Sequence, residues 1–354
     1  MNSSFLYSRI GEMVTFLVGP PGYSERMDAN ISKLCKVSPV FNAMLRGPMR
    51  ESDQFVRIED TDSRGFACFI TWIQDSRLVL RSVPTALSVL YLSHKYMVPE
   101  ILEPVLQYIL CNVNEDTVLQ VLQTILLYYR PPGLPSAPSL PPAPSLQACE
   151  PSSPSPSPPS PPPPSLPPQQ HDLYEKVFAV CLTTFDRSAS RILESEEVED
   201  LSRDLLVLLL SRSSLRIQSE IEIARAVERW GSVQARRSGY TRAQVLGDTT
   251  YLIRFLTMSA QEFKRGVAGT GLLSTQEEQS LLFCLIRPGA WLPPQLDGIR
   301  GVLSTPRRWR DRNRAWFTIK QKNQLQVKPT CRDIGERRFT AVEKVFLCLA
   351  CIFD

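Results

Sequence analysis

The sequence predicts an α+β unit followed by an all-helical unit, with a proline-rich insertion near the start of the second unit. Strand and helix patterns alternate as far as residue 111, and only helix patterns follow. Eighteen of the 30 prolines lie at 131–168, interleaved with serines. The chain has 354 residues, of which 43% are hydrophobic, so each unit can bury a core of ordinary size.

The first unit begins with an apolar strand pattern at 14–18 and a Gly-Pro-Pro-Gly turn at 19–22. Ser38 can cap a helix whose first position is Pro39. A further helix carries a core stripe at spacing i, i+3, i+4, i+7, made of Phe66, Phe69, Ile70 and Ile73. The other elements predicted here are strands at 55–58 and 78–80 and helices at 84–91 and 101–110.

The second unit contains helix patterns at 112–129, 172–192, 201–210 and 219–234. The segment 131–170 lacks the amide donors and apolar side chains that packing needs. We therefore predict an extended, polyproline-like insertion there. Its PxxP patterns match ligands of SH3-type grooves, but a stretch so rich in proline produces them by chance.

The charge of the chain is uneven. From Arg300 onward there are 13 Lys or Arg and five Asp or Glu, a net charge of +8, which leaves −4 for the rest. Aromatic residues are interleaved with these cations, a composition that could bind phosphates by charge and bases by stacking. The alternative is a solvated basic linker. The candidate nucleic-acid or acidic-surface residues are Arg307, Arg308, Arg310, Arg312 and Arg314.

The longest apolar runs, at 205–210 and 345–353, fall far short of the roughly 20 residues that span a membrane. The first residues do not match a secretory signal. Nine scattered cysteines without a pairing pattern indicate thiols in a reducing compartment. We expect a soluble cytoplasmic protein without a membrane partner, with the nucleus as an alternative location.

No catalytic, cofactor or metal site is predicted. The sequence has no phosphate loop, GxSxG or HExxH motif. The one CxxC pair, Cys348 and Cys351, lacks a second pair of the kind that a structural zinc site uses. His94 lies in an apolar helix pattern, where we expect a packed or capping histidine. The chain is not expected to be an enzyme.

Three segments, at 14–19, 38–45 and 90–99, together resemble successive landmarks of the BTB/POZ fold in their order and spacing. The resemblance implies an α+β BTB/POZ domain at 8–111. The sequence also departs from the family pattern at two positions. Met13 stands where the family has Asp, and Asn30-Ile31 replaces a His-Arg pair. A carboxylate and a cation are lost together, so neither is left buried and unpaired.

The helical segments 201–230 and 245–263 resemble a BACK domain, the second of them in the subfamily that also carries a C-terminal PHR domain. We therefore expect an all-α BACK domain at 112–285, interrupted by the disordered insertion 131–170. A basic linker at 286–337 would follow. Residues 338–354 resemble the opening strand of a PHR β-sandwich, which one strand cannot complete. We expect a shortened form or an incomplete sequence, without the functions of a PHR domain.

The resemblance implies an adaptor that joins a protein substrate to a cullin-3 ubiquitin ligase and self-associates through its BTB domain. In the family, a hydrophobic residue, any residue and a glutamate in one loop help to bind the cullin. Met49, Arg50 and Glu51 match that pattern. The alternatives are a BTB scaffold without a cullin and a nucleic-acid-linked regulator that uses the arginine-rich tail. The replaced charges at Met13 and Ile31 make the dimer less secure.

Overall fold

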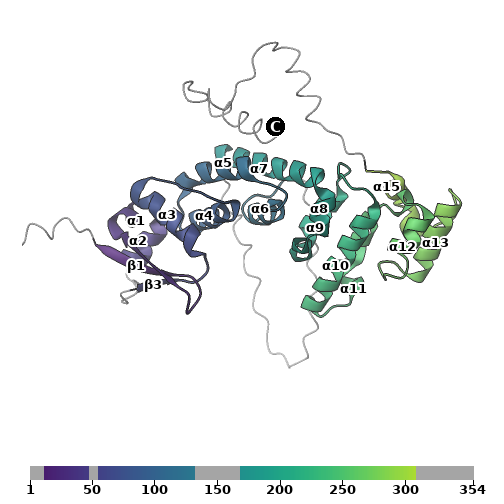
Figure 1. Cartoon of the computed structure of the whole chain (residues 1–354), viewed down its shortest axis with the longest axis horizontal. Helices are drawn as coiled ribbons and strands as arrows, with labels where there is room; N and C mark the ends of the chain where they lie inside the picture. Colours follow the sequence, from purple (N-terminus) through teal and green to yellow (C-terminus); the bar gives the residue numbers. More distant parts are fainter. Residues whose placement is uncertain (1–11, 48–54, 132–167, 308–354) are drawn as a thin grey trace, which may run out of the picture.

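The structure is a computed structural model, and it describes residues 12–47, 55–131 and 168–307. These residues form an elongated, helix-rich molecule with one small sheet. Figure 1 shows the sheet and helices α1 to α4 at one end, α5 to α7 in the middle, and α12, α13 and α15 at the other end. The opposite ends of the described chain therefore lie far apart.

The sheet has three strands in the order β2-β1-β3. The central strand β1 (Met13–Val18) pairs antiparallel with β2 (Glu25–Asn30) and parallel with β3 (Phe55–Ile58). The strands predicted at 14–18 and 55–58 are thus confirmed. β2 was not predicted from its residue pattern, because its sequence ERMDAN is mostly polar and its side chains are mostly outside the core.

The strand expected at 78–80 was a wrong prediction. Among the described residues, this segment pairs with no strand. Leu78 and Leu80 instead pack against the core as an irregular connection, and the Cys68 thiol contacts the carbonyl oxygen of Val79. The apolar pattern reflected burial of the leucines, which a connection between two helices can provide as well as a strand.

Helices cover the sheet and enclose an aromatic core. Phe41 stacks on Tyr96 at a centroid distance of 4.1 Å, and Phe16 contacts Phe66 edge-on at 5.1 Å. The predicted cap at Ser38 is present, because its hydroxyl oxygen accepts from Phe41 N at 3.0 Å. The helices of this part are α1 (Ile31–Val37), α2 (Pro39–Arg46), α3 (Ser63–Asp75), α4 (Val83–Lys95), the 3-10 turn η3 (Pro99–Ile101) and α5 (Leu102–Asn112).

The helix predicted at 112–129 is shorter in the structure, because Asn112 still belongs to α5 and the next helix spans only Val118–Ile125. The side chain of Asn114 accepts from the backbone N–H groups of Asp116 and Thr117, which turns the chain between α5 and the next helix. The helices that follow are α6 (Val118–Ile125), α7 (Pro168–Arg187), α8 (Ala189–Glu194), α9 (Arg203–Ser211), α10 (Glu220–Ser238), α11 (Arg242–Leu246), α12 (Ala260–Gly266), α13 (Thr275–Ile286), α14 (Pro294–Asp297) and α15 (Arg300–Ser304).

Two predicted boundaries differ from the structure. The insertion placed at 131–170 ends earlier, because α7 already begins at Pro168. The basic linker placed at 286–337 begins with folded chain as far as Arg307. Burial of three leucines explains why this segment folds: Leu292, Leu296 and Leu303. The remainder of that linker and the expected PHR remnant at 338–354 lie outside the described residues.

Candidate protein-interaction surfaces

The predicted cullin-binding residues Met49, Arg50 and Glu51 lie outside the described residues, but both flanks of their loop are described. The loop leaves α2 at Gly47 and enters β3, an edge strand of the sheet. A Cβ atom at Gly47 would approach the carbonyl oxygen of Ala43 to 2.1 Å, so only glycine permits this exit from the helix. The loop therefore begins at a rigid helix end.

The positions that depart from the BTB pattern lie together. Met13 and Asn30 are partners in the β1–β2 ladder, and Met13 is 52% exposed. Asn30 caps α1 by accepting from Lys33 N, and its own N–H donates to Gln74 Oε1 at 3.3 Å. Met13 and Asn30 are both uncharged, and Asn30 bonds the local backbone; Ile31, the second replaced position, follows as the first residue of α1.

A cluster of aromatic residues joins the two halves of the molecule. His94 on α4 lies with Nε2 2.6 Å from the hydroxyl oxygen of Tyr174 on α7, and its ring stacks on Tyr128 at 3.8 Å. Burial lowers the pKa of His94 to about 4 and raises the pKa of Tyr174. His94 is therefore a neutral, packed histidine, as its sequence context predicted.

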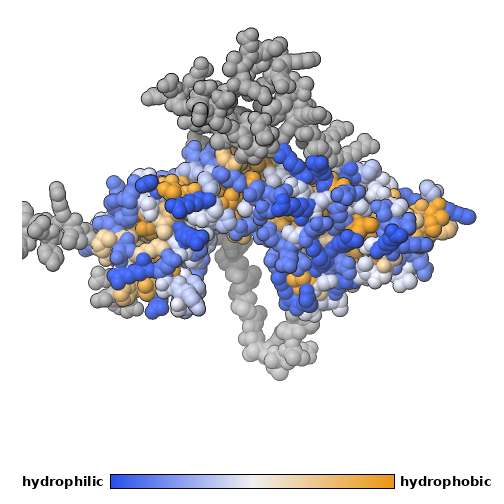
Figure 2. All heavy atoms as spheres, in the orientation of Figure 1, coloured by the Kyte–Doolittle hydropathy of each residue, from blue (hydrophilic) through white to orange (hydrophobic). Residues whose placement is uncertain are grey.

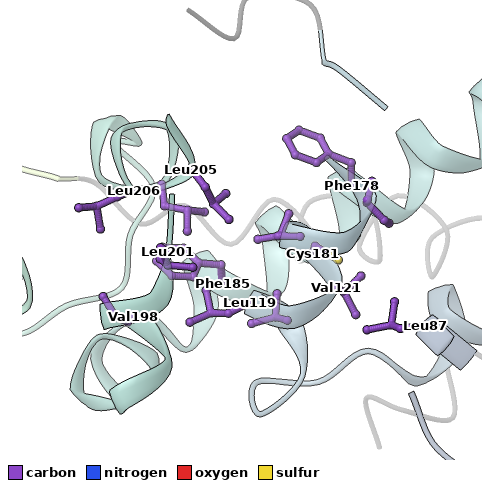
Figure 3. Close-up of a cluster of buried hydrophobic side chains, with 14 of the residues drawn as sticks. Leu87, Leu119, Val121, Phe178, Cys181, Phe185, Val198, Leu201, Leu205 and Leu206 are labelled. Atoms are coloured by element: carbon purple, nitrogen blue, oxygen red, sulfur yellow. The ribbon is translucent and has the colours of Figure 1, made fainter. Parts of the chain in front are cut away.

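The aromatic cluster continues into a shared hydrophobic core (Figure 3). Buried hydrophobic side chains from α4, α6, α7 and α9 meet there. Cys181 at its centre is fully buried, which raises the pKa of its thiol to about 12. The described members of this junction core include Leu87, Leu119, Val121, Phe178, Cys181, Phe185, Val198, Leu201, Leu205 and Leu206. The sheet-bearing part and the helical part are thus packed as one body.

An open groove of about 560 Å³ runs between the start of α5 and the start of α7. Its lining includes three carboxylates and one lysine, with Glu100 and Glu103 on one side and Asp172 with Lys176 on the other. Lys176 is already paired with Asp172 at 2.6 Å, so the two glutamates contribute most of the unbalanced charge. The net negative charge of the groove favours a partner with basic residues.

Arg307, the first of the predicted nucleic-acid arginines, is buried inside the helical part. Its guanidinium bonds both carboxylate oxygens of Glu220, at 2.7 and 3.3 Å, and three backbone carbonyls. The two side chains are 2% and 5% exposed. All five N–H donors of the guanidinium have partners, so Arg307 does not face a ligand. Arg308, Arg310, Arg312 and Arg314 lie outside the described residues.

Sequence patterns did not predict the role of Arg307 or Glu220. Arg254 completes the network: its N–H donates to Glu220, and its guanidinium donates to the Thr305 carbonyl at 2.9 Å and to the Ser213 hydroxyl at 2.7 Å. A charged residue at the first position of α10 is an ordinary signal for a helix start. Nothing local in the sequence distinguishes a first-turn glutamate in solvent from one that binds an arginine 87 residues away.

Two further properties apply to the described part of the chain only. It contains no group of three or more His, Cys, Asp or Glu placed to hold a metal ion. None of its helices is both long enough and apolar enough to cross a membrane. Cys348 and Cys351 lie outside it.

Comparison with known proteins places these features in a family context. Residues 169–268, from α7 to just beyond α12, match the family model described as BACK, BTB And C-terminal Kelch. The chain is similar to human BTB/POZ domain-containing protein 3, with 24% identity over 273 residues that cover 76% of the chain and 44% of the relative. It is also similar to BTB/POZ domain-containing protein 6-A of Danio rerio, with 23% identity over 342 residues, 94% of the chain and 53% of the relative.

Residues 169–268 are thus similar to a BACK domain, and the chain is similar to BTB/POZ domain-containing proteins; its described part has a small α+β part followed by a helical part. The matched BACK residues begin at α7, later than the predicted start at 112. The chain spans about half the length of the curated relatives it matches. A relation to PHR proteins remains a prediction.

Proposed function

We propose that this protein is a substrate-recognition subunit of a cullin-3 ubiquitin ligase and that it self-associates through its BTB part. The supporting observation is the junction core, through which α4, α6, α7 and α9 pack as one body. An adaptor of this kind acts by holding a substrate at a set distance from the transferring enzyme. A continuous core keeps that distance fixed, whereas a flexible linker would let it vary.

The proposed cullin surface combines the loop of Met49 to Glu51 with the acidic groove between α5 and α7. An apolar side chain at a loop tip can anchor in a pocket of the partner, and the adjacent carboxylate can set the register by a charge-assisted hydrogen bond. The groove would receive a basic segment of the cullin. The substrate would bind the BACK part or the tail.

The decisive experiment is the capture of cullin-3 by the full chain and by a Met49→Ala, Glu51→Ala double variant. We expect capture by the wild type and a loss of about tenfold or more in affinity for the variant. The control is Tyr23→Ala with Glu25→Ala, which removes an exposed aromatic side chain and an exposed carboxylate outside that loop. Undiminished binding by the loop variant contradicts the proposed site.

Self-association is tested by sedimentation of the purified full chain. A dimer that captures no cullin-3 would indicate the alternative scaffold. Salt-dependent retention of DNA or RNA on a filter would indicate the alternative nucleic-acid regulator. The position of Arg307 weakens that last alternative, because its guanidinium is already occupied by Glu220 and backbone carbonyls.

A further inference from the structure

One exposed serine lies against a buried cation in the helical part. Ser213 is in the turn that follows α9, and it is exposed. Its hydroxyl oxygen accepts from Arg254 Nη2 at 2.7 Å. Arg254 itself is only 5% exposed. Figure 2 shows a largely hydrophilic surface over α9 and α10, where charge rather than apolar area decides what can bind.

The buried guanidinium of Arg254 lacks a counter-charge. Glu220 accepts from the backbone N–H of Arg254, but both of its carboxylate oxygens bond the guanidinium of Arg307. Within the described part of the chain the Arg254 guanidinium forms no ion pair, and its acceptors are neutral: the Thr305 carbonyl and the Ser213 hydroxyl. Two guanidiniums and one carboxylate thus leave an excess of one positive charge where water can do little to screen it.

The cost of this burial shows in the pKa and in the donors of Arg254. Burial lowers the pKa of its guanidinium, and the positive charge of Arg307 lowers it further. A guanidinium has five N–H donors, and only two of those of Arg254 have acceptors among the described residues. An anion placed at Ser213 would supply both the missing charge and acceptors for the remaining donors.

The next serine in the same turn has the opposite surroundings. The hydroxyl of Ser214 donates to Asp186 Oδ2 at 2.6 Å, and Asp186 is 7% exposed. Arg212 lies 3.5 Å from the same hydroxyl, but its guanidinium already bonds both carboxylate oxygens of Asp186. A negative group on Ser214 would therefore meet a carboxylate, whereas one on Ser213 would meet a cation without a counter-charge.

We propose that Ser213 is a phosphorylation site and that Arg254 binds its phosphate. A serine/threonine kinase would transfer the γ-phosphoryl group of ATP to the Ser213 hydroxyl. A bond forms between Oγ and the phosphorus, and the bond from that phosphorus to the β,γ-bridging oxygen breaks. ADP leaves with that oxygen, and the hydroxyl proton passes to the catalytic base of the kinase. The product carries a charge of about −1.5 to −2 and three acceptor oxygens beside the buried guanidinium.

The modification would tighten one connection within the helical part. Arg254 already joins the turn after α9 to Thr305, just beyond α15. A charge-assisted hydrogen bond to phosphate is shorter and stronger than the present bond to a neutral hydroxyl. Phosphorylation would therefore hold these two segments together more firmly. Because this effect does not depend on cullin-3, either proposal can fail without the other.

The first test installs phosphoserine in the full chain by genetic code expansion, at position 213 and, as the matched control, at position 214. We expect phosphoserine at 213 to raise the melting temperature by about 2 to 4 °C and phosphoserine at 214 to give no increase. In an Arg254→Gln variant, phosphoserine at 213 should give no increase either. No increase at 213 in the unaltered background, or an equal increase at both positions, would overturn the proposal.

A second measurement observes the phosphate itself and needs no change at Arg254. Phosphorus NMR over a series of pH values gives the second pKa of each phosphoserine, which is ordinarily about 6. Arg254 should lower this pKa at position 213, with Arg307 and Glu220 behind it. Asp186, paired with Arg212, should keep the pKa at position 214 higher. Equal pKa values at the two positions would show that Arg254 does not bind the phosphate.

Occupancy of the site is tested in cultured eukaryotic cells that express the full chain in the presence of a phosphatase inhibitor. Peptide mapping by mass spectrometry should locate phosphate on Ser213, and Ser213→Ala should remove it. A chain that carries phosphate on Ser214 instead, or on neither serine of the turn, would overturn the proposal.

Discussion

His94 Nε2 and the hydroxyl oxygen of Tyr174 lie 2.6 Å apart, although 80 residues separate them in the chain. His94 belongs to α4 beside the sheet, and Tyr174 belongs to α7, which begins after the proline-rich insertion. This contact therefore joins the α+β part to the BACK part. An adaptor with a fixed geometry needs a junction of this kind. Because His94 titrates, the contribution of the junction to stability can be measured as a function of pH.

We predict that acid weakens the junction through His94. Burial holds the pKa of His94 at about 4, below the ordinary value of 6.5 in the unfolded chain. The unfolded state therefore binds a proton first, and stability is lost as the pH falls from about 6.5 towards 4. Between pH 7 and pH 5, the free energy of unfolding should fall by about 1 to 2 kcal/mol from this group.

Urea unfolding at a series of pH values measures this effect. His94→Gln should remove most of the pH dependence between pH 7 and pH 5, because the amide does not titrate. His171→Gln, which changes the only other histidine in the sequence, should retain it. Equal pH dependence in the wild type and in His94→Gln would show that the histidine is not buried as described.

We predict that Arg307 is part of the folded BACK core. Arg307→Met should lower the free energy of unfolding by about 3 to 5 kcal/mol, because it leaves the buried carboxylate of Glu220 without its cation. Thermal unfolding followed by circular dichroism measures the loss. Arg237→Ala is the control, since its pair with Asp200 is 55% and 61% exposed and should contribute less than about 1 kcal/mol. Similar effects of the two changes would contradict the buried network.

We predict that the proline-rich insertion can be shortened without loss of fold. Tyr129 before it and His171 after it are in ring contact at 5.1 Å, so the two ends of the insertion are already close. Replacing residues 132–167 with eight Gly and Ser residues should raise the free energy of unfolding by about 1 kcal/mol through a smaller loop-closure entropy. Capture of cullin-3 should not change. If the full chain captures cullin-3 weakly and the shortened chain captures it strongly, the insertion disturbs α6.

We predict that the groove between α5 and α7 contributes to cullin affinity. Glu100→Lys with Glu103→Lys reverses its unbalanced charge and should weaken cullin-3 binding by about tenfold, more strongly at low salt. Biolayer interferometry at two salt concentrations measures this change. Glu196→Lys with Glu197→Lys, on the exposed 3-10 turn η4 (Glu196–Asp200), is the matched control. An equal loss in the control would indicate a general effect of net charge.

Much of the fold could be predicted from local patterns. Ser38 caps α2 as expected, and Phe66, Phe69, Ile70 and Ile73 form the buried stripe of α3. The same patterns failed where an apolar or polar residue pattern is compatible with both a strand and an irregular connection. Residues 78–80 are apolar because they pack against the core, and β2 is polar because it lies at the edge of the sheet. A polar strand at the edge of a sheet lacks the apolar residues from which strands are predicted.

Only the part of the candidate site that lies within one stretch of sequence could be predicted. The motif of Met49 to Glu51 was identified from the surrounding resemblance, whereas the acidic groove was not, because its walls come from two helices about 70 residues apart. The exposure of single apolar side chains could not be predicted either. Exposure of Phe283 and Trp291 depends on which neighbours cover them, and spacing along the chain does not specify those neighbours.

The sequence by itself determined the local elements: the helix caps, the buried stripe of α3, the insertion rich in proline and the concentration of positive charge after Arg300. Tertiary structure alone decided which of these residues meet. It buried Arg307 against Glu220 and placed His94 against Tyr174. The physical reason is that capping and periodicity act over a few residues, whereas the partner of a buried charge or a packed ring is chosen by the folding of distant segments around one core.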